Sequence, residues 1–153
     1  MIITVYTDGA CTSSGVYKGI GGWGYSIHCS KAEMENSGGM IDTTSNRMEI
    51  EAVIKALTQI YETKHLYDED STIIVYSDSE LIVKTMNPDG GFAQKKNYDK
   101  WIELNKIVDN LESLGFGIRF IWVKAHDKDV RNNRVDKLAT KARDKMKGVL
   151  RWL

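Results

Sequence analysis

The chain has 153 residues, of which 42% are hydrophobic and 27% are charged, a balance typical of a globular domain with a sizeable core. No run of about 18 apolar residues exists, which excludes a membrane-spanning helix, and the N-terminal MIITVYTDG lacks the basic and apolar regions of a signal peptide. The only two cysteines, Cys11 and Cys29, favour reduced thiols in a cytoplasmic compartment over a disulfide framework.

The net charge is zero, but the charges are unevenly distributed. Residues 1–75 hold 5 basic and 10 acidic side chains, whereas residues 76–153 hold 16 and 11. From Arg119 onward there are 11 basic residues and 4 acidic ones. This basic C-terminal segment could face phosphate groups, although on charge alone a solvated helix surface is an equally good interpretation.

Nine segments carry the pattern of a strand or of a helix. Strands are indicated by runs of β-branched and aromatic residues, and helices by apolar residues on one 3.6-residue stripe. In chain order the predicted elements are strands at 2–6, 19–29 and 34–40, a helix that follows an N-cap at 44–46 and carries its apolar stripe at 50–61, a strand at 72–76, helices at 80–86 and 98–114, a strand at 117–123, and a helix after residue 131 with its apolar stripe at 135–146.

This order predicts an α/β fold with a mixed five-stranded sheet flanked by helices. Short connections join the first three strands, which should therefore be antiparallel. The fourth strand, 72–76, shows no alternation and should be buried on both faces, and it and the fifth should run parallel to the first. Without a linker or an internal repeat, residues 1–153 are predicted to form a single domain.

Four acidic residues stand at comparable places in these elements. Asp8 follows the first strand and Asp78 follows the fourth. Glu49 and Asp136 lie beside the apolar stripes of the first and last long helices. Because ligands of open α/β sheets bind beyond the carboxyl ends of the strands, we expect these four side chains to converge.

Each acid also has a structural alternative. Asp8 could cap a turn, and Asp78 could cap the helix that follows it. Glu49 has capping-box spacing from Asn46, with Thr44, Ser45 or Asn46 as the N-cap. Asp136 could be an ordinary helix-surface residue.

Converging carboxylates repel one another unless a cation neutralises them. Ligand sets made only of oxygen favour Mg²⁺ or Mn²⁺ over Zn²⁺. Two such ions about 3.5–4 Å apart would clamp the attacking and leaving oxygens of a phosphodiester displacement, so that no Ser or Cys nucleophile would be needed.

Five short motifs in order resemble the type 1 ribonuclease H family: YTDGA at 6–10, TSNRME at 44–49, YSDS at 76–79, WVKAH at 122–126 and NNRVDKLA at 132–139. The resemblance covers nearly the whole chain and implies the ribonuclease H-like fold. It implies endonucleolytic cleavage of the RNA strand of an RNA/DNA hybrid, leaving 5′-phosphate and 3′-hydroxyl ends. It also implies that Asp8, Glu49, Asp78 and Asp136 bind two Mg²⁺ ions, or Mn²⁺ as a substitute, and that His126 assists proton transfer or product release.

The same resemblance implies a set of substrate-binding residues, which are Gly9, Cys11, Ser14, Thr44, Ser45, Asn46, Lys124 and Asn132. Ser45 stands where the family usually has an Asn that contacts the RNA 2′-hydroxyl, so its reach is shorter. The basic handle of many bacterial relatives is missing, because residues 87–97 carry only Lys95 and Lys96 as cations. We therefore predict a handle-less monomer whose affinity depends on a partner protein or domain, or on Lys124, Lys128, Arg131, Arg134 and the basic last helix.

Other functions remain open at this point. The chain could be a different nuclease on the same fold, such as a junction resolvase or an integrase, or a hybrid-binding module without catalysis. It could also be a ribonuclease H domain detached from a reverse transcriptase. Among the other residues, we expect Trp23, Trp101 and Trp122 in the core and Arg47 paired with Glu51.

Overall fold

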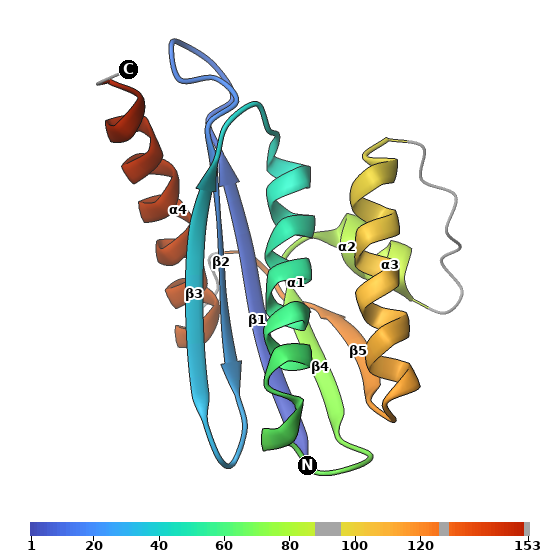
Figure 1. Cartoon of the computed structure of the whole chain (residues 1–153). Helices are drawn as coiled ribbons and strands as arrows, with labels where there is room; N and C mark the ends of the chain where they lie inside the picture. Colours follow the sequence, from blue (N-terminus) through green and yellow to red (C-terminus); the bar gives the residue numbers. More distant parts are fainter. Residues whose placement is uncertain (88–95, 126–128, 152–153) are drawn as a thin grey trace.

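A computed structural model describes residues 1–87, 96–125 and 129–151 of the chain. Its five strands form one sheet in the order β3-β2-β1-β4-β5 (Figure 1). The strands are β1 (Ile2–Cys11), β2 (Gly21–His28), β3 (Glu33–Met40), β4 (Thr72–Ser77) and β5 (Gly117–Trp122). β1, β2 and β3 pair antiparallel, whereas β4 pairs parallel with β1 and with β5. The predicted mixed sheet is confirmed.

Helices cover both faces of this sheet. They are α1 (Ser45–Glu62), α2 (Glu80–Met86), α3 (Tyr98–Ser113) and α4 (Val130–Leu150), with a short 3₁₀ turn at Lys64–Leu66. α1 packs on β1 and β2 and is flanked by α3, whereas α4 packs on β1, β2 and β3 from the other side (Figure 1). None of the described helices is long and apolar enough to cross a bilayer.

The largest part of the core lies between α1, α3 and the sheet. Ile3 and Val5 of β1 and Ile73 and Val75 of β4 are fully buried there, and Trp101 anchors α3 with 1% of its surface exposed. These apolar side chains hold α1 against β1 and β4, the strands that carry or precede Asp8 and Asp78.

A glycine-rich β2 lets α4 approach the other face closely. A Cβ atom on Gly22 would lie 2.2 Å from the carbonyl oxygen of Ala139, and one on Gly24 would lie 3.0 Å from that of Val135. Real Cβ atoms essentially never approach another atom as closely as one on Gly22 would, and one on Gly24 would also lie only 2.7 Å from the Cβ atom of Leu138, so these two positions need glycine unless α4 shifts. The contact brings the middle of α4, including Asp136, next to β1.

Several details differ from the sequence prediction. β1 does not stop at residue 6 but continues through Asp8 to Cys11, because its last residues still pair with β2. β4 alternates between buried and half-buried residues, since α4 lies over β1–β3 and leaves one face of β4 partly open. Trp122 is 45% exposed because it ends β5, which lies at the border of the sheet, whereas Trp23 and Trp101 are core residues as predicted.

Candidate metal centre

The parallel register of β1 and β4 places Asp8 beside Asp78. The last paired residues of the two strands are Thr7 and Ser77, and each is followed directly by its acid. Glu49 reaches the same place from α1 because Gly9 has no side chain: a Cβ there would lie 2.5 Å from the backbone nitrogen of Glu49. One carboxylate oxygen from each of the three acids lies within 4.8 Å of the other two. The predicted convergence is therefore observed for Asp8, Glu49 and Asp78.

The helix caps do not involve these acids, so two of the structural alternatives are wrong. Thr44 is the N-cap of α1, and its hydroxyl accepts a hydrogen bond from the backbone N–H of Arg47 at 3.2 Å. Ser79 is the N-cap of α2 and accepts from the backbone N–H of Ile82 at 3.3 Å. The hydroxyl groups of Thr44 and Ser79 cap the two helices, so neither Glu49 nor Asp78 has the capping role considered for it.

Burial and mutual repulsion raise the pKa values of the clustered acids. Asp8 is 4% exposed, and desolvation, the negative charge of Asp78 and a hydrogen bond with Asp136 raise its pKa from 3.8 to about 8. Desolvation, followed by the charges of Asp8 and Asp78, raises the pKa of Glu49 well above its ordinary range. Such a cluster is costly to ionise without a cation, which is the electrostatic signature of a functional site.

The residues present fit a hard divalent cation. Oε2 of Glu49 is buried and accepts no hydrogen bond within the described parts of the chain. A buried acceptor without a donor is unusual, because its desolvation is not compensated. A cation held by Asp8, Glu49 and Asp78 would satisfy this oxygen and neutralise the repulsion, and three carboxylates are ligands of the Mg²⁺ and Mn²⁺ type.

Asp136 lies beside this cluster but is not one of the three tightly grouped acids. It extends from α4 to the side chain of Asp8, with which it can share a hydrogen bond when one of the two carboxyl groups is protonated, and this contact helps raise the pKa of Asp8. The group that meets the 4.8 Å criterion, within residues 1–87, 96–125 and 129–151, consists of Asp8, Glu49 and Asp78. The place of Asp136 as a fourth ligand stays a prediction.

Several predicted substrate-binding residues lie together near the ends of β1 and α1. Thr44, Ser45 and Asn46 are exposed at the start of α1, and Ser14 is exposed in the β1–β2 loop. The Cys11 thiol is half-buried and donates to the carbonyl oxygen of Thr43 at 3.5 Å. The loop and the start of α1 are therefore neighbours.

The remaining predicted residues have varied surroundings. Lys124 is exposed after β5, whereas Asn132 is only 3% exposed. Its Oδ1 atom is buried without a hydrogen-bond partner among the described residues. Gly9 lies against α1, which gives this glycine a packing role. His126 lies outside the described residues.

Sequence reasoning missed a tether between β1 and the start of α4. The Tyr6 hydroxyl donates to Oδ2 of Asp129 at 3.2 Å, while Oδ1 of Asp129 caps α4 by accepting from the backbone N–H groups of Arg131 and Asn132. Burial, followed by the charge of Asp129, raises the pKa of Tyr6 to about 12. An Asp at a helix start is a recognisable N-cap signal, but the tyrosine contact spans 123 residues of sequence.

Arg47 and Arg134 form ion pairs that differ from the roles predicted for them from the sequence. Arg47 pairs with Asp99 of α3 through two hydrogen bonds of 2.9 and 2.7 Å, not with Glu51. Arg134 donates two hydrogen bonds of 3.1 and 2.6 Å to Glu35 of β3. Because its charge is matched there, Arg134 is less available to a phosphate than the sequence suggested.

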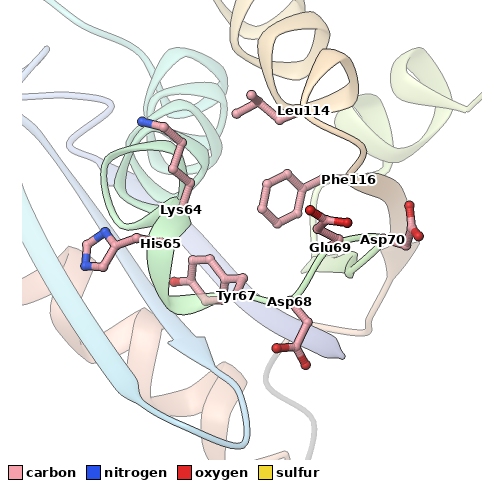
Figure 2. Close-up of a pocket in the computed structure, with 8 residues that line it drawn as sticks. All are labelled: Lys64, His65, Tyr67, Asp68, Glu69, Asp70, Leu114 and Phe116. Atoms are coloured by element: carbon pink, nitrogen blue, oxygen red, sulfur yellow. The ribbon is translucent and has the colours of Figure 1, made fainter.

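A separate pocket lies at the other end of the strands. Its lining residues are Lys64, His65, Tyr67, Asp68, Glu69, Asp70, Leu114 and Phe116. Figure 2 shows Tyr67 and Phe116 among these residues, and their rings are arranged edge to face with centroids 6.2 Å apart. These residues precede β4 and β5, whereas Asp8 and Asp78 lie near the opposite ends, so the pocket does not belong to the metal centre.

The mixed sheet and its carboxylate cluster define a class of protein in which acidic residues at strand ends can hold divalent cations. Comparison with known proteins makes the class specific. The RNase H family model matches residues 1–144 of the chain. The chain therefore belongs to the ribonuclease H family.

Individual relatives align with this chain over nearly their full lengths. The chain is 34% identical over 146 residues to Ribonuclease H of Campylobacter jejuni subsp. jejuni (strain 81-176), covering 92% of this chain and 90% of that protein. It is 35% identical over 154 residues to Ribonuclease H of Trichodesmium erythraeum (strain IMS101), covering 94% and 90%. Among solved structures, LC11-RNase H1 in complex with RNA/DNA hybrid is similar with a TM-score of 0.75 and 26% identity, covering 94% of this chain and 98% of that one.

Proposed function

We propose that this chain is an endoribonuclease that hydrolyses the RNA strand of RNA/DNA hybrids with two Mg²⁺ ions and leaves 5′-phosphate and 3′-hydroxyl ends. The observation that carries the proposal is the group of three carboxylates within 4.8 Å, in which Asp8 has a pKa raised to about 8. Membership of the ribonuclease H family and the similarity to LC11-RNase H1 bound to RNA/DNA hybrid support this choice of substrate.

Asp8, Glu49, Asp78 and Asp136 would hold the cations, with Mn²⁺ as a substitute for Mg²⁺. When bound as a pair, such ions supply an activated water and stabilise the attacking and leaving oxygens of a phosphodiester displacement. The side chains would fix where this chemistry takes place: Asp8 and Asp78 would act from β1 and from the end of β4, and Glu49 and Asp136 would approach from α1 and α4.

Substrate recognition is proposed to involve the exposed groups around the cluster. The hydroxyl groups of Ser14, Thr44 and Ser45 and the amide of Asn46 are exposed, and such groups can exchange hydrogen bonds with RNA 2′-hydroxyls. The exposed Lys124 would contact a phosphate.

The other predicted residues would act closer to the acids. Gly9 and Cys11 would lie beside the RNA strand, and Asn132 would support the same surface from α4. His126 would assist proton transfer or product release, for which its unperturbed pKa near 6.5 is suitable. Residues 1–153 would work as one domain and as a monomer in the cytoplasm.

The proposal is tested with the variants Asp8→Asn and Asp78→Asn, which keep the size of each side chain and remove its charge. We expect each to lower Mg²⁺-dependent cleavage of a hybrid by at least about 10³-fold, since a cation ligand is lost. Asp109→Asn, at an exposed position of α3, is the matched control and should cleave normally. Circular dichroism checks that each variant is folded, and undiminished cleavage by either folded site variant would overturn the proposal.

A further inference from the structure

The two flanks of α4 carry basic residues with different surroundings. Arg134 contacts Glu35 of β3, and Lys141 and Lys145 line a depression beside residues 37–39 of the same strand. We call this the β3 flank, and it faces away from the metal centre.

The opposite flank continues from the metal centre along the helix. Asp136, Thr140, Arg143 and Lys147 recur at intervals of three and four residues, so they lie on one side of α4. We call this the β1 flank. Since the first of them contacts Asp8, the other three follow in line from the acidic cluster toward the C-terminal end of the helix.

Contacts with β1 and its loop confirm this orientation. Burial raises the pKa of the Cys11 thiol, and the nearby positive charge of Arg143 partly opposes this shift. Nζ of Lys147 lies 5.7 Å from the centre of the Tyr17 ring. Figure 1 shows the β1–β2 loop and the C-terminal end of α4 at the same end of the molecule. The β1 flank therefore borders the loop that carries Ser14.

The charge of the β1 flank is only partly matched. Nε of Arg143 donates to Oδ1 of Asp144 at 3.1 Å, and Nζ of Lys147 lies 3.7 Å from the same oxygen. Among the described residues, two cations thus share one carboxylate, whereas Arg134 on the β3 flank donates two hydrogen bonds to Glu35. Counted over the residues that the structure describes, the pair keeps an excess positive charge, and each of its side chains is 25% exposed.

We propose that Arg143 and Lys147 bind backbone phosphates of the nucleic acid on one side of the metal centre, forming a phosphate site on the β1 flank. The proposal rests on the proposed function, because it assumes that a hybrid occupies the acidic cluster. At 1.5 Å per helical residue, the two cations lie about 10 and 16 Å along α4 from Asp136. With about 3.4 Å per nucleotide, this corresponds to about three and five nucleotides from the scissile bond.

Asp144 has a definite part in this arrangement. Because its carboxylate accepts from Arg143 and attracts Lys147, it competes with a phosphate for the same cations. Removing its charge in Asp144→Asn should therefore tighten binding of the hybrid, and weaker binding would count against the site.

The test compares two double variants of one helix. Arg143→Ala/Lys147→Ala removes the phosphate site, and Lys141→Ala/Lys145→Ala removes the same charge from the β3 flank as the matched control. Binding of a fluorescein-labelled RNA/DNA hybrid is measured by anisotropy in EDTA, which prevents cleavage, over a series of salt concentrations.

Loss of two phosphate contacts should make the negative slope of log affinity against log salt shallower by about 1.8. Between about 50 and 200 mM salt, the wild-type affinity should then fall about 12-fold more than that of the Arg143/Lys147 variant. The control should keep the wild-type slope, because the proposal restricts the phosphate contacts expected of the basic last helix to its β1 flank. Equal slopes for the two double variants, or a wild-type slope in the first, would overturn the phosphate site.

Cleavage by the wild-type chain in Mg²⁺ is measured in parallel, so that the two proposals fail separately. If the wild type cleaves the hybrid but the two double variants show the same salt dependence of binding, the phosphate site alone is overturned. A clear difference in affinity without any cleavage overturns the proposed function and leaves the phosphate site standing.

Discussion

Replacing Asp8 by Asn should stabilise the cation-free protein at pH 8, although the same change removes a proposed metal ligand. Asp8 is 4% exposed, and burial together with the charge of Asp78 raises its pKa from 3.8 to about 8. The folded protein therefore holds this proton more tightly than the unfolded chain does. The contribution of this tighter proton binding to the free energy of unfolding is fully present below about pH 4 and is lost as the pH rises through 8.

The size of the effect follows from the same values. At about 1.4 kcal/mol per pH unit, a pKa raised from 3.8 to about 8 corresponds to a ceiling of about 6 kcal/mol in the free energy of unfolding. Because Glu49 and Asp78 share the repulsion and the backbone can relax, we expect a loss of about 1–3 kcal/mol between pH 5 and pH 8. Asn is neutral throughout, so Asp8→Asn should lose less stability over this range.

Urea unfolding in EDTA, followed by tryptophan fluorescence at pH 5 and pH 8, measures this difference. Asp109→Asn is the control for removal of an exposed acid and should follow the wild type. Mg²⁺ at pH 8 should restore the stability of the wild type more than that of Asp8→Asn. A wild type that is equally stable at both pH values, or an Asp8→Asn variant that is no more stable at pH 8, would refute the electrostatic reasoning.

Two further changes test the contacts that hold α4 against β1. Tyr6→Phe keeps the aromatic ring but removes the hydrogen bond to Asp129, and urea unfolding should show a loss of about 1 kcal/mol; unchanged stability would mean that the tether contributes nothing. Gly22→Ala places a Cβ atom 2.2 Å from the carbonyl oxygen of Ala139, so α4 must shift and the free energy of unfolding should fall by about 3 kcal/mol. Gly148→Ala, whose Cβ atom would meet no other part of the described chain within 4 Å, is its control and should be neutral or stabilising, so equal effects of the two substitutions would contradict the close-contact argument.

Hydrophobic periodicity was sufficient to predict the order of the elements and the mixed sheet. It did not predict that β1 continues past Asp8, because the pairing of Cys11 with Gly21 of β2 depends on a partner strand. The exposure of Trp122 follows from the place of β5 at the border of the sheet, which is also a tertiary property. Local patterns indicate that an element exists, whereas strand pairing decides where it ends and which face is covered.

The candidate site was predictable in part. Asp8, Asp78 and Glu49 share positions at strand ends or beside a helix stripe, and the structure brings these three together. Partners of basic residues were not predictable, because Arg47 and Asp99 lie 52 residues apart in the sequence. Such pairs depend on how α3 docks on α1, which local spacing does not encode.

Cleavage of one sequence presented as RNA/DNA, RNA/RNA and DNA/DNA, each with Mg²⁺ and with EDTA, tests the proposed activity most directly. We predict cleavage of the RNA strand in the RNA/DNA hybrid with Mg²⁺, products with 5′-phosphate and 3′-hydroxyl ends, and no cleavage in EDTA. An intact hybrid in Mg²⁺, cleavage that persists in EDTA, or equal cleavage of the RNA/RNA duplex would contradict it.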